Sequence, residues 1–192
     1  TYRRRELTTI HRPNLREIAA TFADKLKNIK VALFDVDGVL TDGRIFWSGE
    51  EVGYNRFTHA QDGFGLKMLK DQGIKVGVIS GGKSIGVKKR FEENLKLNYV
   101  FFGNEDKREA YLSVLKDGYT DSQVLYMGDE FFDIPLLKRA GFSASVPNAS
   151  EEVREVVDYV TYIEGGKGAV REVIDLIRYA QGFSPKILDF GE

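Results

Sequence analysis

The sequence of 192 residues contains no cysteine, four prolines and a single tryptophan. The absence of cysteine excludes thiol catalysis, zinc–thiolate centres and disulfide bonds, and it permits a reducing compartment, so we expect a cytoplasmic protein. The sequence also lacks an excess of charges of one sign, because 28 basic residues nearly balance 29 acidic residues. We therefore expect neither nucleic acid nor a membrane surface as a partner. No apolar run has the length of a transmembrane helix, and the first residues lack the apolar core of a secretory signal.

What is present is the composition of an ordinary globular domain, with 42% hydrophobic and 30% charged residues. We divide the chain into a leader at 1–28, a core at 29–181 and a C-terminal tail at 182–192. In the leader, Asn14 and Glu17 predict the start of an amphipathic helix. The apolar positions that recur at helical spacing in this segment are Leu15, Ile18, Ala19, Phe22 and Leu26.

Short apolar segments alternate with helical patterns along the core, and this alternation predicts βαβ units. The predicted strands are 29–34, 75–79, 99–102 and 124–127, and the predicted helices are 65–70, 84–94, 107–115, 134–139, 150–156 and 169–180. The pattern is typical of a doubly wound α/β fold with a mostly parallel sheet. The segment 44–57 interrupts it and predicts a β-hairpin. In such sheets ligands bind beyond the carboxyl ends of the strands, so we expect the chemistry there.

Two carboxylates follow the first predicted strand. Asp35 comes directly after the strand, and Asp37 lies two residues further along the chain. An aspartate can accept a phosphoryl group as a covalent acyl phosphate, which suits Asp35. A second carboxylate can protonate the leaving alkoxide and later activate water, which suits Asp37. The structural alternative is an acidic turn, since Asp and Gly both favour turns.

The second and third strands are followed by groups that suit a phosphate. Ser80 and Gly81 offer a hydroxyl and free backbone amides before a helix, although a simple N-cap is the alternative. Lys107 opens a helix, where the helix dipole disfavours a cation. A lysine that holds a phosphoryl group explains this position, and a solvated surface lysine is the alternative.

The fourth strand runs into a further set of carboxylates. Asp129 and the neighbouring Glu130 follow the strand, and Asp133 lies one turn further along. Magnesium prefers hard oxygen ligands, so Asp35, Asp129 and the main-chain carbonyl of Asp37 are candidate ligands of Mg²⁺. Glu130 and Asp133 are candidates for orienting the waters of the metal. An acidic helix N-terminus explains each of these residues singly, but not the polar groups at four strand ends.

The ordered set resembles the four motifs of phosphatases of the haloacid dehalogenase superfamily. It consists of Asp35-x-Asp37, Ser80, Lys107 and Gly128-Asp129-x-x-x-Asp133. The similarity spans 29–181 and implies a Rossmann-like core, a phosphorylated aspartate and a magnesium cofactor. Most members carry an inserted cap domain, for which the spacing between the motifs leaves no room.

Capless members resemble the phosphatases of 3-deoxy-manno-octulosonate 8-phosphate and their sialic-acid-like relatives. Two segments of this chain look like that branch, 40–43 and 164–172. The resemblance implies a small phosphorylated sugar acid as substrate, as in lipopolysaccharide biosynthesis, and a homotetramer joined through the 44–57 hairpin. It also implies that Lys167 or Arg171 contacts an anionic substrate, in its own or a neighbouring subunit. Aromatic residues of the hairpin support its burial between subunits.

Two positions depart from the pattern of this branch. The family usually has Thr-Gly-Arg at the second motif, where this chain has Ser80-Gly81-Gly82, so the arginine expected to meet the sugar acid is missing. Lys83 is a candidate substitute, as a point charge without the fork of a guanidinium. At the fourth motif, Glu130 replaces the usual second aspartate.

Three alternatives stay open at this point. The substrate could be a sialic-acid-like 9-phosphate, or the chain could be a catalytically weak regulatory module related to sugar-nucleotide synthetases. A phospho-receiver domain also combines Asp, Ser, Lys and magnesium, but receivers have no acid two residues after the phosphorylated aspartate. For His11 and His59 we expect solvated or helix-capping roles and not metal binding.

Overall fold

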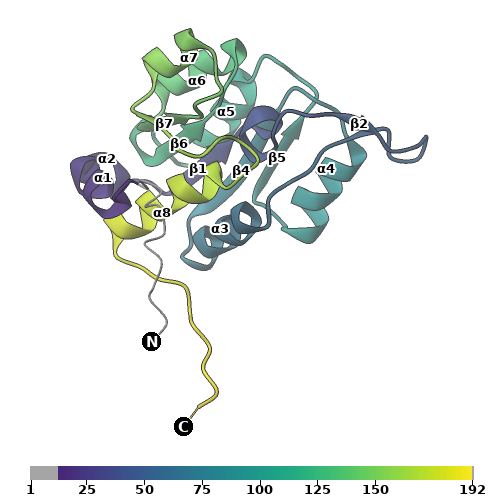
Figure 1. Ribbon diagram of the computed structural model, residues 1–192. Helices are drawn as coiled ribbons and strands as arrows, with labels where there is room; N and C mark the ends of the chain where they lie inside the picture. The colour runs from purple at the N-terminus through teal and green to yellow at the C-terminus, as the bar shows by residue number, and fades with distance from the viewer. Residues whose placement is uncertain (1–12, 192) are drawn as a thin grey trace, which may run out of the picture.

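The computed structural model describes residues 13–191, and it shows a six-stranded parallel sheet between two layers of helices (Figure 1). The strands, in the order in which they pair, are β5 (Tyr99–Phe102), β4 (Lys75–Ser80), β1 (Val31–Phe34), β6 (Val124–Met127), β7 (Phe142–Ser145) and β8 (Tyr159–Val160). Every residue of the central strands β1 and β6 is buried. The near-continuous apolar character of these strands follows from this burial on both faces.

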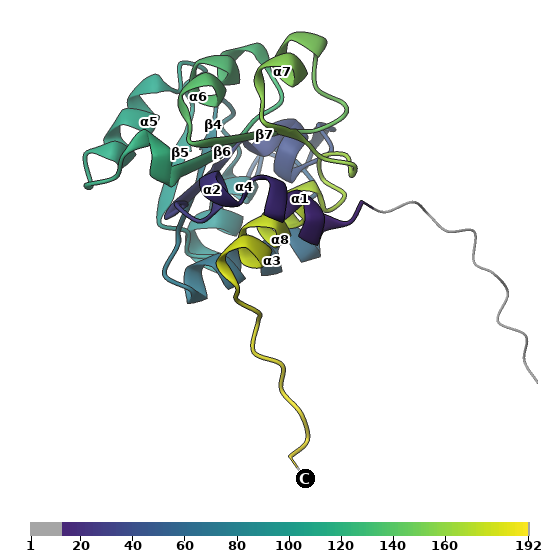
Figure 2. The same ribbon diagram turned by 90° about the vertical axis from the view of Figure 1, so that its left-hand side faces the viewer.

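Helices cover both faces of the sheet, as Figures 1 and 2 show. One layer contains α1 (Leu15–Thr21), α2 (Ala23–Leu26), α3 (Ala60–Asp71) and α8 (Ala169–Gln181), and the other contains α5 (Arg108–Leu115), α6 (Ile134–Arg139) and α7 (Glu151–Val156). The short helix α4 (Ile85–Lys89) follows β4. This arrangement confirms the predicted doubly wound α/β class.

The structure corrects several element predictions. The sheet contains β7 and β8 in addition to the four predicted strands, and α3 begins at Ala60 instead of near residue 65. The leader helix is interrupted at Phe22, and its N-cap is Asn14 as predicted, since the Asn14 side chain accepts hydrogen bonds from Arg16 N and Glu17 N. His11 and the rest of 1–12 lie outside the described residues.

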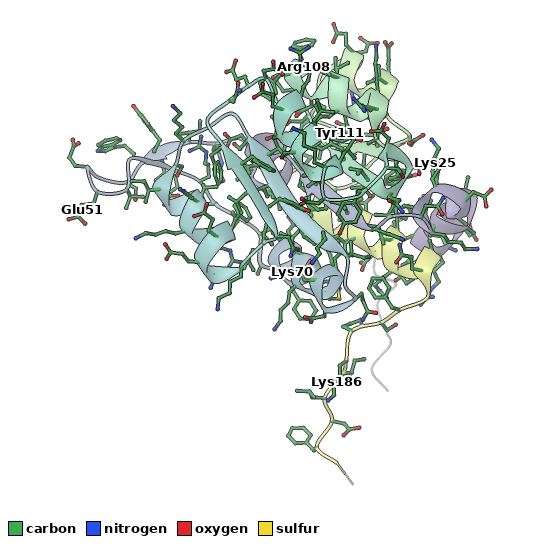
Figure 3. All side chains as sticks on the ribbon, turned by 180° about the vertical axis from the view of Figure 1, so that it is seen from behind. Lys25, Glu51, Lys70, Arg108, Tyr111 and Lys186 are labelled. Carbon is green, nitrogen blue, oxygen red and sulfur yellow. The ribbon has the colours of Figure 1, made fainter. Side chains whose placement is uncertain are left out.

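The predicted hairpin is present, with short strands β2 (Phe46–Trp47) and β3 (Tyr54–Asn55). It projects from the core, with Glu51 at its tip in Figure 3. At the other end of the chain, residues 183–191 have no regular structure, and this tail, which carries Lys186, extends away from the helices. Within 13–191, the helices are too short or too polar to cross a membrane.

Candidate active site

The first strand brings Asp35 to the centre of the sheet edge. β1 pairs with β4 on one side and with β6 on the other, so Asp35 leaves the sheet between two neighbouring loops. Its backbone N–H donates to the carbonyl of Met127 at 2.9 Å, and its Oδ1 accepts from Val36 N at 2.6 Å. The turn that follows includes Gly38 at φ +84°, where a Cβ would lie 1.9 Å from Asp129 Oδ2. Glycine at this position therefore allows the loop after β1 to approach Asp129 in the loop after β6.

Lys107 is buried beneath this loop. Its Nζ lies 2.9 Å from Asp35 Oδ1, 2.6 Å from Asp133 Oδ1 and 3.4 Å from the hydroxyl of Tyr126. The residue is 1% exposed, which excludes the alternative of a solvated surface lysine. A buried ammonium needs paired anions, and the two aspartates provide them.

Asp133 organises the loop after β6. Its Oδ2 accepts from the backbone N–H groups of Asp129 at 3.0 Å and Glu130 at 3.1 Å, and its Oδ1 accepts from Tyr126. The side chain of Glu130 accepts from its own neighbour Phe131 at 2.8 Å, so it caps the short turn that follows. Asp133 thus fixes the position of Asp129, as expected for a residue that supports a metal ligand.

The carboxylates of Asp35, Asp129 and Asp133 form a cluster with oxygens within 4.8 Å of one another. Burial, together with the negative charges of Asp133 and Asp129, raises the pKa of Asp35 well above its usual value, against the opposing effect of Lys107. Burial and the charge of Asp133 raise the pKa of Asp129 to about 7. The buried Asp129 Oδ1 has no hydrogen-bond partner within the described residues. Hard oxygens, surplus negative charge and an orphaned acceptor fit a divalent cation such as Mg²⁺.

Asp37, Ser80 and an unpredicted arginine gather around Gly82. Ser80 is buried, and its Oγ accepts from Gly82 N at 3.2 Å. Asp37 Oδ1 accepts from Arg56 Nε at 2.6 Å, and Asp37 Oδ2 accepts from Arg56 Nη2 at 3.0 Å. A Cβ on Gly82 would lie 3.2 Å from Arg56 Nη2, 3.3 Å from Asp37 Oδ2 and 3.6 Å from Ser80 Oγ. The loops after β1 and β4 and the end of the hairpin therefore meet here.

The glycine segment before α8 packs directly on the turn after Asp35. A Cβ on Gly165 would lie 1.8 Å from the carbonyl oxygen of Gly38, and Gly166 N donates to the Val39 carbonyl at 3.0 Å. A side chain at 165 would therefore displace the turn that follows the candidate nucleophile.

The candidate substrate residues Lys83, Lys167 and Arg171 contact groups other than the clustered carboxylates. Lys167 forms an ion pair with Glu164, and Arg171 Nε lies 3.1 Å from Asp175 Oδ1. The aliphatic stem of Lys83 lies over the loop that follows β5. The structure thus brings Asp35, Lys107, Asp129 and Asp133 together and gathers Asp37 and Ser80 at Gly82, whereas Lys167 and Arg171 pair with Glu164 and Asp175.

A parallel sheet with acids after β1 and β6, a serine at the end of β4 and a buried lysine after β5 defines a hydrolase of the haloacid dehalogenase class. The family model of haloacid dehalogenase-like hydrolases matches residues 99–174. The chain is 40% identical over 146 residues to the 3-deoxy-D-manno-octulosonate 8-phosphate phosphatase KdsC of Haemophilus influenzae. The aligned region covers 76% of this chain and 80% of that protein. The chain therefore belongs to the 3-deoxy-D-manno-octulosonate 8-phosphate phosphatase family, and it is a phosphatase of the haloacid dehalogenase type.

Solved structures agree with this assignment. A subfamily IIIA hydrolase of the superfamily from Legionella pneumophila aligns with a TM-score of 0.81 and 39% identity, covering 86% of this chain and 91% of that chain. The octulosonate phosphatase of Moraxella catarrhalis, in complex with magnesium, phosphate and KDO, aligns with a TM-score of 0.79 and 39% identity, covering 84% and 92%. The predicted family and the capless architecture are confirmed, and the receiver alternative is excluded.

Proposed function

We propose that this phosphatase hydrolyses a phosphorylated sugar acid of the 3-deoxy-manno-octulosonate 8-phosphate type, with Mg²⁺ as cofactor. The observation that carries the proposal is the buried cluster in which Lys107 pairs with Asp35 beside Asp129. Asp35, Asp129 and the main-chain carbonyl of Asp37 are the proposed ligands of Mg²⁺. The magnesium, phosphate and KDO bound to the Moraxella relative support the same chemistry in this chain.

The reaction we propose has two steps. The Asp35 carboxylate attacks phosphorus, the bond to the ester oxygen breaks, and Asp37 gives a proton to the leaving alkoxide. Water, which gives a proton to Asp37, then attacks the phosphorus of the acyl phosphate, and the bond to Asp35 breaks to release phosphate. Ser80, the Gly81 amide and Lys107 bind the phosphoryl oxygens. Bound Mg²⁺ supplies positive charge that offsets the charge of the phosphoryl group.

The test is an Asp35→Asn variant assayed with an aryl phosphate and with a panel of sugar phosphates. We expect the variant to lose at least about 10³-fold in kcat, because an amide is a poor nucleophile. Asp106→Asn is the matched control, since Asp106 is exposed and pairs with Arg108 on the surface. Activity retained by Asp35→Asn would refute the mechanism.

The same panel separates the candidate substrates. Octulosonate 8-phosphate should give the highest kcat/KM, and a preference for a sialic-acid-like 9-phosphate would change the assigned substrate but not the mechanism. Undetectable turnover of every phosphate ester by the wild type, despite magnesium binding, would favour the weak regulatory module. The cytoplasmic location expected from the sequence stays a prediction.

We also propose that the chain forms a homotetramer through the 44–57 hairpin. Aromatic side chains on this hairpin are exposed in the single chain, and burial between subunits would remove them from water. In such an assembly Lys167 and Arg171 are candidates for contacting a substrate held by a neighbouring subunit.

A further inference from the structure

We propose that Arg56 binds the carboxylate of the substrate and so sets the preference of this phosphatase for sugar acids. The role rests on the proposed function, because it needs a substrate with a second anionic group. The hairpin would then make the contact that the family resemblance implies for an arginine in the loop after β4.

The guanidinium of Arg56 is held at the site before any substrate arrives. Its Nε and Nη2 donate to the two oxygens of Asp37, and its Nη1 donates to the Tyr54 carbonyl at 3.2 Å. Its side chain is 8% exposed, although it belongs to a projecting hairpin. A desolvated cation held in one orientation binds an anion at a lower entropic cost than a solvated surface arginine does.

Gly82 leaves space that Arg56 fills. The Nη2 atom lies 3.2 Å from the point where a Cβ of residue 82 would be, so the guanidinium lies where a side chain from this loop would begin. Two other cations are near: Lys107 lies between Asp35 and Asp133, where the phosphoryl group would bind, and the stem of Lys83 lies over Gly103. Arg56 thus places a guanidinium beside both Asp37 and Gly82.

The geometry of the pair with Asp37 leaves donors for a second carboxylate. Asp37 occupies the edge formed by Nε and Nη2, and an arginine has five N–H groups, of which the three contacts above use three. The two remaining N–H groups, one on each terminal nitrogen, are available to donate to a carboxylate. Arg56 can thus bridge the carboxylate of the substrate and Asp37, so that a sugar acid is oriented relative to the proton donor.

The experiment compares two competitors of aryl phosphate hydrolysis, 6-phosphogluconate and sorbitol 6-phosphate. They differ at one terminal carbon, which is a carboxylate in the first and a hydroxymethyl group in the second. We expect the wild type to bind 6-phosphogluconate about 10- to 100-fold more tightly, which is the effect of a hydrogen-bonded charged pair. Arg56→Gln should reduce this ratio to about one. Taking the ratio cancels any change in Asp37 that affects both competitors equally.

A double variant tests whether a guanidinium supplied from residue 82 restores the preference that is lost in Arg56→Gln. Gly82 does not have a positive φ, so Gly82→Arg is compatible with its backbone, and Arg56→Gln removes the guanidinium that the new Cβ would approach. The double variant Arg56→Gln/Gly82→Arg should recover at least part of the lost ratio. Arg56→Lys keeps the charge without the fork and should give an intermediate ratio. The matched control is Arg139→Gln, since Arg139 pairs with Asp121 on the surface.

Each outcome decides the proposal. An equal loss of affinity for both competitors in Arg56→Gln would show that Arg56 acts on the phosphate or on Asp37, and would overturn it. An unchanged ratio, or a wild type that does not distinguish the two competitors, would overturn it as well. A third result separates the two proposals. If the wild type does not hydrolyse octulosonate 8-phosphate but prefers the carboxylated competitor, and Arg56→Gln loses this preference, the proposed substrate is wrong and the role of Arg56 stands.

Discussion

At the scale of single residues, the buried ammonium of Lys107 balances an otherwise anionic cluster. It is enclosed with Asp35 and Asp133, and Asp129 adds a third carboxylate nearby. Removing one partner of a buried ion pair costs far more than removing a surface pair, because the remaining charges keep their desolvation penalty. Lys107 therefore contributes to stability as well as to the site.

We predict that Lys107→Met lowers the free energy of unfolding by about 3–5 kcal/mol and abolishes phosphatase activity. Excess Mg²⁺ should stabilise the variant more than the wild type, because the cation then balances carboxylates that have lost their ammonium. Urea unfolding with and without Mg²⁺ measures both effects. Lys88→Met, which removes an exposed ion pair with Glu92, should change the midpoint little. Equal midpoints for Lys107→Met and the wild type would contradict the buried pair.

Sequence patterns predicted the candidate site where each group lies at, or shortly after, the carboxyl end of a strand. Asp35, Ser80, Lys107 and Asp129 meet this condition, because parallel strands deliver their carboxyl ends to one edge of the sheet. Arg56 does not meet it. It lies 19 residues after Asp37 in the sequence, directly after the second strand of the hairpin. No local spacing of residues predicts such a contact. Its 8% side-chain exposure is likewise a consequence of tertiary packing.

At the scale of elements, α8 is tied to α3 by a buried carboxylate. Asp62 Oδ1 accepts from Arg171 N at 2.8 Å, in the first turn of α8. Its Oδ2 has no hydrogen-bond partner within 13–191. Burial raises the pKa of Asp62 to about 6, although the nearby His59 and Arg171 oppose this change. The Asp62 side chain therefore caps the first turn of α8, and above about pH 6 it does so as a buried negative charge.

We predict that Asp62→Asn stabilises the protein relative to the wild type as the pH rises. A raised pKa in the folded state gives stability that is fully present below about pH 4 and is lost as the pH rises through about 6. Asparagine keeps the acceptor for Arg171 N and does not titrate, so the variant should gain about 2 kcal/mol relative to the wild type between pH 4 and pH 8. Chemical unfolding at both pH values measures this difference.

The matched variant Asp62→Ala separates the cap from the charge. It removes the titrating group as Asp62→Asn does, but it also removes the acceptor for Arg171 N, so it should be about 1 kcal/mol less stable than Asp62→Asn at every pH. A stability difference between Asp62→Asn and the wild type that does not change with pH would contradict the raised pKa.

The glycine segment before α8 gives a second prediction at this scale. In Gly165→Ala the new Cβ meets the carbonyl of Gly38, which is backbone and cannot turn aside, so the turn after Asp35 must move. We expect kcat to fall at least about tenfold, with a stability loss of about 1–3 kcal/mol. Gly118→Ala is the control: Gly118 has φ +99° and open space, so it should lose about 1 kcal/mol of stability without losing activity. Full activity in Gly165→Ala would show that the segment does not position the turn.

The element predictions failed where strands were short and polar. β7 consists of Phe142–Ser145 and contains two serines, and β8 has two residues, so neither shows an apolar run. Pairing next to β6 buries these serines, and Ser145 Oγ donates to the Gly128 carbonyl at 2.7 Å. Burial there depends on neighbouring strands and side-chain hydrogen bonds, which residue periodicity does not report.

At the scale of the whole molecule, the hairpin is a structured part that a single chain leaves uncovered (Figure 1). Phe46 stacks on Phe57 with centroids 4.9 Å apart, and Trp47 contacts Tyr54 at 5.2 Å. These pairs lie within the hairpin, yet Trp47 is 54% and Tyr54 is 61% exposed, so they do not pack on the core. An isolated two-stranded hairpin is marginally stable, which favours its burial against other subunits.

We predict that Trp47→Lys/Tyr54→Lys converts the proposed tetramer into smaller species, because it places two charges in the surface that the subunits would bury. Light scattering measures the mass, and kcat/KM for the proposed sugar-acid phosphate should fall with it if neighbouring subunits complete the sites. Leu112→Lys alters an exposed apolar residue of α5, far from the hairpin in sequence, and should leave the mass unchanged. A wild-type chain that is monomeric at micromolar concentration would contradict the assembly. Each site would then have to bind its substrate with Arg56 and the other residues of one chain.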